Sequence, residues 1–95
     1  MDTREYYEKI DGRDFEFNLP VINKLEEKNF DIYRLNEFVK QNCNLQTRRI
    51  ATFTRKYDYV NKETRNIFLQ IIFDSENGKV ELGSQEAEII SKFKK

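Results

Sequence analysis

The amino-acid sequence predicts an α+β fold in which a three- or four-stranded antiparallel sheet packs against helices. Residues 47–82 contain three segments rich in aromatic and β-branched side chains, separated by polar turns. On both sides of this region, apolar residues recur at the spacing of amphipathic helices. A chain of 95 residues is too short for two hydrophobic cores. We therefore expect one domain over residues 1–95, with the element order α-β-α-α-β-β-β-α.

The first half of the chain is expected to be mainly helical. A short helix over Asp2–Ile10 and a short strand over Phe15–Leu19 come first. Pro20 then stands where a helix begins, because the first residues of a helix need no backbone N–H. Helical spacing continues to Asn42. We expect a break at Asn29-Phe30-Asp31, because Asn adopts the left-handed conformation and Asp is a good helix cap.

The second half is expected to form three strands and a closing helix. The strands are predicted over Arg48–Tyr59, Ile67–Phe73 and Lys79–Leu82. An Asn-Gly pair within residues 75–78 predicts a hairpin between the last two strands, because both residues tolerate positive φ. The helix is predicted over Ser84–Lys95, with Ser84 as its cap and with its charges aligned to favour the helix dipole.

Alternation along the Ile67–Phe73 strand separates two faces. One face is wholly apolar and is expected in the core; it consists of Ile67, Leu69, Ile71 and Phe73. The opposite face remains largely apolar, and contiguous exposed apolar residues usually mark an interface. Together with residues of the preceding strand, it predicts a candidate homodimer face formed by Ile50, Thr52, Phe68 and Ile72.

Composition excludes several classes of site. The chain has one cysteine and no histidine, which rules out an intrachain disulfide, a zinc site built from several Cys and His residues, and a Cys–His nucleophile. No glycine-rich phosphate loop is present, and we expect no metal and no cofactor. The sequence shows no signal peptide and no apolar run of transmembrane length, so a cytoplasmic protein without a membrane partner is expected.

Positive charge is concentrated in one stretch although the net charge is zero. Residues 47–65 carry six basic and only two acidic side chains, and tyrosines are interleaved with them. Clustered Arg and Lys attract phosphates or acidic protein surfaces, and aromatic rings can stack on unpaired bases. The predicted partner-binding residues are Arg48, Arg49, Arg55, Lys56, Tyr57, Tyr59, Lys62 and Arg65, and the predicted partner is an acidic protein surface or a nucleic acid.

These observations favour a small non-catalytic protein that acts by stoichiometric binding to a nucleic acid or to a protein machine that handles one. The chain is rich in Asn, Lys, Ile, Phe and Tyr and poor in Ala, Gly and Pro, a bias typical of AT-rich genomes. An AT-rich genome follows from that bias, such as that of a low-GC bacterium, its phage or a mobile element, and a phage or mobile-element protein is the expectation. Inhibitors of bacterial defence systems, such as anti-CRISPR proteins, are therefore candidates.

Two alternatives remain open at this stage. From Phe15 onward the element order matches that of RelE/ParE-type toxins, some of which cleave mRNA with basic and tyrosyl side chains; Arg55, Tyr57 and Arg65 are the candidates for such roles. The order also matches a winged helix, with residues 31–42 as the recognition helix of a DNA-binding regulator. Both rest on the order of elements, which does not by itself establish function.

Overall fold

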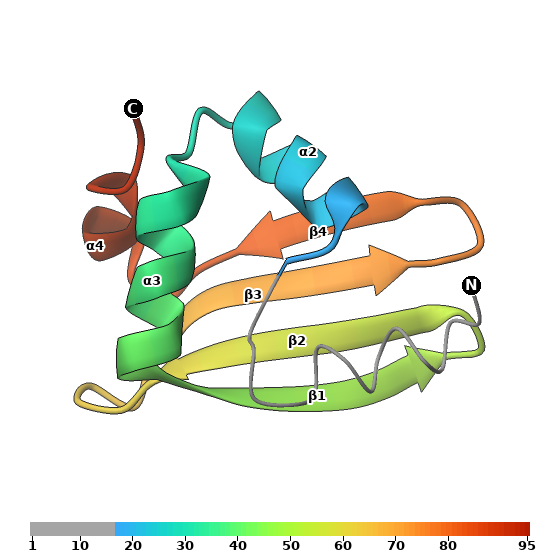
Figure 1. Cartoon of the computed structure of the whole chain (residues 1–95). Coiled ribbons are helices and arrows are strands. Elements are labelled where there is room, and N and C mark those ends of the chain that lie inside the picture. Colours follow the sequence, from blue (N-terminus) through green and yellow to red (C-terminus); the bar gives the residue numbers. More distant parts are fainter. Residues whose placement is uncertain (1–16) are drawn as a thin grey trace.

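The computed structural model describes residues 17–95 and has the α+β fold that the sequence predicts (Figure 1). Four antiparallel strands follow one another across the sheet in the order β1-β2-β3-β4. The described helices lie on one face of this sheet (Figure 1), which we call the helix side; the opposite face is the open side. The elements are α2 (Leu19–Glu27), α3 (Ile32–Asn42), β1 (Cys43–Ala51), β2 (Thr54–Asn61), β3 (Ile67–Asp74), β4 (Lys79–Gly83) and α4 (Ala87–Ser91).

The predicted N-terminal helix over Asp2–Ile10 lies outside the described residues. The predicted strand over Phe15–Leu19 is wrong in its described part, because Asn18 caps α2 and Leu19 is already its first residue. The side chain of Asn18 accepts a hydrogen bond from the backbone N–H of Val21 at 3.0 Å. Such a cap satisfies a helix N–H group that has no partner within the helix.

The predicted break between two helices is confirmed at Asn29-Phe30-Asp31. Asn29 adopts a left-handed conformation with φ 68°, which ends the first helix. Phe30 is buried in the core, and the carboxylate of Asp31 accepts a hydrogen bond from the backbone N–H of Arg34 at 3.2 Å. The chain therefore reverses direction within three residues, so that α2 and α3 both reach the sheet.

The predicted strand over Arg48–Tyr59 is wrong, because the chain turns at Thr52-Phe53. The first part of this segment belongs to β1 and the second to β2, and β1 begins at Cys43 directly after α3. The turn is held by a neighbouring arginine side chain and by a residue from another hairpin. Arg49 donates to the carbonyls of Ala51 and Thr52 at 3.3 and 3.0 Å. The backbone N–H of Ser75 donates to the Phe53 carbonyl at 2.8 Å.

A β-bulge changes the predicted faces of β3. Tyr59 is opposite Leu69, and the next residue, Val60, is opposite Ile67, which leaves Phe68 as the extra residue. Phe68 and Leu69 are consequently both buried. The Phe68 ring packs against those of Phe38 in α3 and Phe93, at centroid distances of 4.5 and 5.7 Å. Phe68 is therefore a core residue, and its predicted place on the outer face is wrong.

The core lies between β2–β4 and the helices. Leu69, Ile71 and Phe73 are buried as predicted, whereas Ile67 is half-buried near the end of its strand. The three buried residues, Leu69, Ile71 and Phe73, belong to one cluster that includes Leu25, Leu35 and Val39 of the helices and Tyr57 and Tyr59 of β2.

The C-terminal helix is shorter than predicted and begins three residues later. Ser84 does not cap it: its hydroxyl donates to the Phe68 carbonyl at 2.6 Å and accepts from the Glu86 N–H at 2.9 Å. Ser84 thus ties the end of β4 to the bulge in β3. The helix itself spans only Ala87–Ser91.

The hairpin between β3 and β4, which the Asn-Gly pair predicts, is confirmed. Gly78 has φ 66°, a conformation that costs glycine little. Asp74 organises the loop by accepting hydrogen bonds from the Asn77 side chain and from the backbone N–H groups of Glu76 and Asn77. These bonds, the one from the Asn77 side chain above all, hold the pKa of Asp74 below its ordinary value.

Candidate binding surface at the hairpin end

The six basic residues predicted as one surface are divided between the two ends of β2. Arg48, Arg49, Arg55 and Lys56 lie where β1 and β2 meet, whereas Lys62 and Arg65 lie in the loop that follows β2. Lys62 is seven positions after Arg55 along the chain, about 23 Å in an extended strand. The predicted surface is therefore wrong as a single patch, and its larger part is at the β1–β2 turn.

The four cations at this turn form two like-charged pairs across the strands. Arg48 is opposite Lys56, and Arg49 is opposite Arg55. Like charges directly opposite each other in a sheet are destabilising. Because side chains alternate, Arg48 and Lys56 lie on the open side, and Arg49 and Arg55 lie on the helix side with Tyr57. Positive charge is thus present on both faces of this hairpin.

Each cation has a different local environment. Arg48 is exposed and makes no hydrogen bond or ion pair with the residues that the structure describes. Arg49 is held against the turn by its two bonds to backbone carbonyls. Arg55 donates to the hydroxyl of Thr47 at 3.1 Å. Lys56 forms an ion pair with Asp58 at 3.5 Å. Arg48 is therefore the most available of these charges.

Two large apolar side chains lie exposed beside these charges. Ile50 and Phe53 each expose 46% of their surface at the turn. Sequence reasoning missed this arrangement because residues 52–53 contain no Gly, Pro, Asn or Asp to mark a turn. We call this surface the hairpin end; it consists of Arg48, Arg49, Ile50, Phe53, Arg55 and Lys56.

The open side of the sheet continues from the hairpin end as a polar surface. Asp58 accepts a hydrogen bond from the Gln70 side chain at 2.9 Å, across β2 and β3. A shallow hollow of about 360 Å³ is lined by three consecutive residues of β1, Gln46 to Arg48, together with Lys56 and Asp58. Consecutive strand residues point to opposite faces, so this hollow also borders the backbone of β1.

Two of the predicted partner-binding residues are in the core. Tyr57 and Tyr59 expose only 2% and 1% of their surface, and the ring of Phe17 packs edge-on against Tyr59 at 5.9 Å. Burial raises the pKa of Tyr59 above its ordinary value. Neither tyrosine offers a face for stacking on a base, so the prediction that their rings contact a partner is wrong.

The predicted dimer face is also wrong as an exposed surface. Phe68 is fully buried, Ile50 and Thr52 belong to the β1–β2 turn region, and Ile72 is half-buried in the middle of β3. These residues do not form one contiguous patch, because the bulge turns Phe68 to the helix side.

The structure does not bring together the residues proposed for the toxin alternative, and the basic residues of the proposed recognition helix have partners of their own. Arg65 lies beyond the end of β2 opposite to Arg55, and Tyr57 is buried between them. In α3, the guanidinium of Arg34 donates to the carbonyl of Lys92 at 3.3 Å and lies over the Phe93 ring. Lys40 is 3.8 Å from the carboxylate of Glu37 in the same helix.

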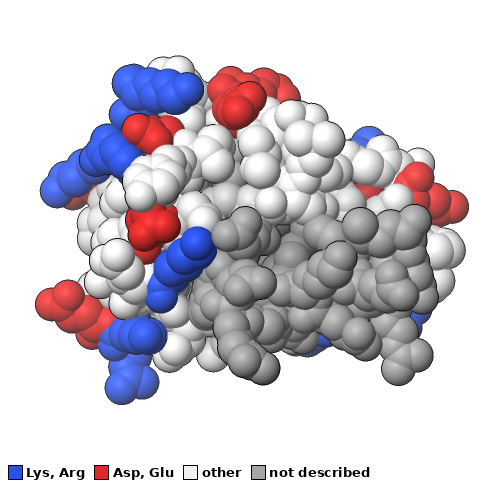
Figure 2. All heavy atoms as spheres, in the orientation of Figure 1, with Lys and Arg blue, Asp and Glu red and all other residues white. Residues whose placement is uncertain are grey.

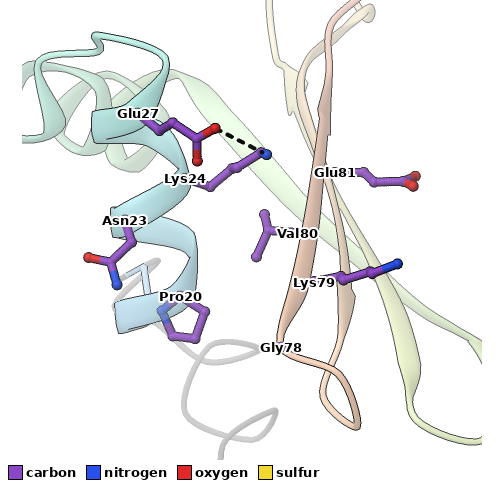
Figure 3. Close-up of a pocket in the computed structure, with 8 residues that line it drawn as sticks. All are labelled: Pro20, Asn23, Lys24, Glu27, Gly78, Lys79, Val80 and Glu81. Atoms are coloured by element: carbon purple, nitrogen blue, oxygen red, sulfur yellow. Dashed lines mark ion pairs between the residues drawn. The ribbon is translucent and has the colours of Figure 1, made fainter.

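The hollow between α2 and β4 has about 680 Å³ of space but few polar groups directed into it. Figure 3 shows Val80 pointing toward α2, whereas Lys79 and Glu81 point away from the hollow. Lys24 is 3.7 Å from Glu27 and so has an ionic partner on its own helix. This hollow therefore does not present convergent groups to a ligand.

Cys43 is buried at the junction of α3 and β1. Burial, with a smaller contribution from Glu86, raises the pKa of its thiol to about 12. A thiol that stays protonated at neutral pH is a poor nucleophile. Within residues 17–95, no cluster of three Cys, Asp or Glu side chains could hold a metal ion.

The outer surface of α3 and α4 shows no uniform charge. In Figure 2, lysine and arginine atoms stand among aspartate and glutamate atoms on the part of the surface occupied by α3 and α4. None of the helices in the described part of the chain is long and apolar enough to cross a membrane. The chain matches no protein-family model, no curated protein and no solved structure.

Proposed function

We propose that this protein acts by stoichiometric binding, and that the hairpin end docks on an acidic surface of a partner protein. The observation that carries the proposal is the pairing of like charges, Arg48 with Lys56 and Arg49 with Arg55, beside the exposed Ile50 and Phe53. Lys56 already has Asp58 as an ionic partner, whereas Arg48 has no acidic partner among the described residues, and an acidic surface would supply one. The two apolar side chains would supply buried anchors at the same place.

Arg49, Arg55 and Lys56 each have a partner within the fold, but the stability of the fold offers no reason for the placement of Arg48. Arg48 contributes no hydrogen bond or ion pair within the described residues, and like-charged neighbours across strands are unfavourable. Single exposed apolar residues are ordinary on protein surfaces. Ile50 and Phe53, however, lie at one turn next to arginines, and arginine and aromatic residues are enriched in protein interfaces.

A protein partner is favoured over a nucleic acid for two reasons. The tyrosines that would have stacked on bases are buried. The protein also carries no net charge, whereas dedicated nucleic-acid binders are usually basic. The wider role that we propose is that of an accessory protein of a phage or mobile element, in the manner of defence-system inhibitors such as anti-CRISPR proteins. The composition favours amino acids whose codons are rich in A and T, which supports this origin.

Affinity capture with charge-reversed variants tests the proposal. The tagged protein and its Arg48→Glu/Arg49→Glu variant are incubated with bacterial lysate at low and high salt. A matched control, Lys62→Glu/Arg65→Glu, makes the same charge change at the far end of β2. We expect the hairpin-end variant to bind its partner roughly 30-fold more weakly, as for the loss of an interface hot spot, and the control to bind normally.

The Phe53→Ala variant separates the apolar anchor from the charges. It should weaken capture at every salt concentration, because salt screens ionic contacts and leaves apolar burial largely intact. Equal capture by all variants would contradict the proposal. A gel shift of DNA or RNA that is lost in Arg48→Glu/Arg49→Glu would instead identify a nucleic-acid partner. Cleavage of mRNA on ribosomes would favour the toxin alternative.

A further inference from the structure

We propose that the partner contributes an extended acidic segment, which binds along the outer edge of β1 and adds a fifth strand to the sheet. This inference rests on the proposed function and specifies how the acidic partner is held. Strand addition uses backbone hydrogen bonds for affinity and alternate side chains for specificity.

The two edges of the sheet are unequal. β4 has five residues and packs beside α2, whereas β1 has nine residues and forms the other edge (Figure 1). Among residues 17–95, no strand pairs with the outer edge of β1. Proteins usually protect a long edge with charged side chains, with proline, with bulges or with a covering element. β1 has no proline, its irregularity is confined to the stretch between Arg49 and Ala51, and its charges are limited to Arg48 and Arg49.

The regular part of this edge is accessible from the open side. Asn44, Gln46 and Arg48 alternate along β1 and are all exposed. The shallow hollow beside them is lined by Gln46 to Arg48 of β1 and by two residues of β2, Lys56 and Asp58, so it lies on the open side of the sheet next to this edge. An extended segment laid along the outer edge of β1 would therefore reach the backbone groups of the edge and the exposed side chains of the open side together.

The charge at this edge selects an acidic segment over a second copy of β1. Arg48 faces the open side of the edge with Lys56 directly behind it, and Arg49 faces the helix side with Arg55 behind it. Residues of an added strand alternate in the same way, so carboxylates on either face would meet a cation pair. A second β1 would bring further arginines to the same edge.

Nuclear magnetic resonance with a synthetic peptide tests the inference. The isotope-labelled full-length protein is titrated at low salt with an eight-residue peptide that alternates Thr and Glu, capped at both ends. We expect the exposed backbone amides at alternate positions in residues 44–48 to exchange with solvent about tenfold more slowly in the complex, as newly formed hydrogen bonds require. The amides of β4 serve as the internal control, because that edge lacks the paired cations.

Three controls make the outcome decisive. A peptide alternating Thr and Lys should not bind, and Arg48→Glu should abolish binding of the Glu peptide. The Glu peptide N-methylated at every residue cannot donate backbone hydrogen bonds, and it should not bind either. If that N-methylated peptide binds equally well and amide exchange in β1 is unchanged, strand addition is wrong although an acidic partner remains supported. If the unmodified Glu peptide does not bind at millimolar concentration, the inference is also overturned. The proposed function is tested separately, by the capture experiment.

Discussion

Ile71 and Ile72 are chemically identical neighbours on β3, yet the sheet places them in opposite environments. Ile71 is 1% exposed against the helices, whereas Ile72 is half-buried on the open side between Lys56 and Glu81. The helix side carries the apolar core, and only its hairpin end holds the cations Arg49 and Arg55. The open side is a surface of polar residues, among them the hydrogen-bonded pair Asp58 and Gln70.

We expect the stability of the fold to depend mainly on the helix side and binding to depend mainly on the open side. Apolar burial, the dominant favourable contribution to folding, is concentrated on the helix side. The open side leaves polar and charged groups accessible, and it meets the exposed apolar residues at the hairpin end. Substitutions on the two sides should therefore have different consequences, which can be measured in matched pairs.

The largest expected effect is that of Phe68→Ala, which tests whether the bulge turns this residue into the core. Removing a fully buried phenylalanine ring should lower the free energy of unfolding by about 3–5 kcal/mol. Gln70→Ala, two residues along the same strand, should cost about 1 kcal/mol through its hydrogen bond to Asp58. Chemical denaturation of both variants measures the difference. Similar small losses would place Phe68 on the open side after all.

Ile71→Ala and Ile72→Ala provide the closest comparison of the two sides. The first should cost about 2–5 kcal/mol, because the cavity is enclosed by the helices. The second should cost roughly 1 kcal/mol, because a half-buried side chain loses less contact with its neighbours. Thermal melts of both variants test the assignment. A shift of no more than about one degree for Ile71→Ala would contradict it.

Alkaline pH should destabilise the helix side through Cys43. The folded-state pKa of this thiol, about 12, lies above the value of 9.0 for an exposed cysteine. The stabilisation is therefore fully present below pH 9 and is lost as the pH rises from 9 toward 12. Between pH 8 and pH 10 the loss should be on the order of 1 kcal/mol. Denaturation of Cys43→Ala at both pH values is the control, and an equal pH dependence in that variant would exclude the thiol as the cause.

The smallest effect on stability is expected from Arg48→Glu on the open side. An exposed substitution without lost contacts should change the free energy of unfolding by less than about 0.5 kcal/mol. Relief of the repulsion with Lys56 should make the change slightly favourable. Denaturation measurements should show the wild-type stability within this range, although the variant loses binding. A large loss of stability would show that Arg48 supports the fold.

Much of the candidate site could be located from the sequence because it follows from local patterns. The concentration of cations in residues 47–65 indicated the right region of the chain, and four of the six charges lie at the end of the β1–β2 hairpin, although the turn itself was not predicted. The break between α2 and α3 followed from the preferences of Asn29 and Asp31, which act over one helical turn. The core position of Ile71 followed from alternation along an apolar strand.

What the sequence determined by itself was therefore the fold class, the helix break and the region of positive charge, since each depends on residues adjacent in the chain. Tertiary structure alone decided the turn at Thr52-Phe53, because Ser75 holds it from another hairpin. It also decided the bulge that buries Phe68, because the rings of Phe38 and Phe93 surround this residue from two helical regions of the chain. Contacts between distant segments thus overrode the local alternation of side chains in β3. They also fixed a turn where a continuous strand had been expected, and Ile50 and Phe53 are exposed at that turn.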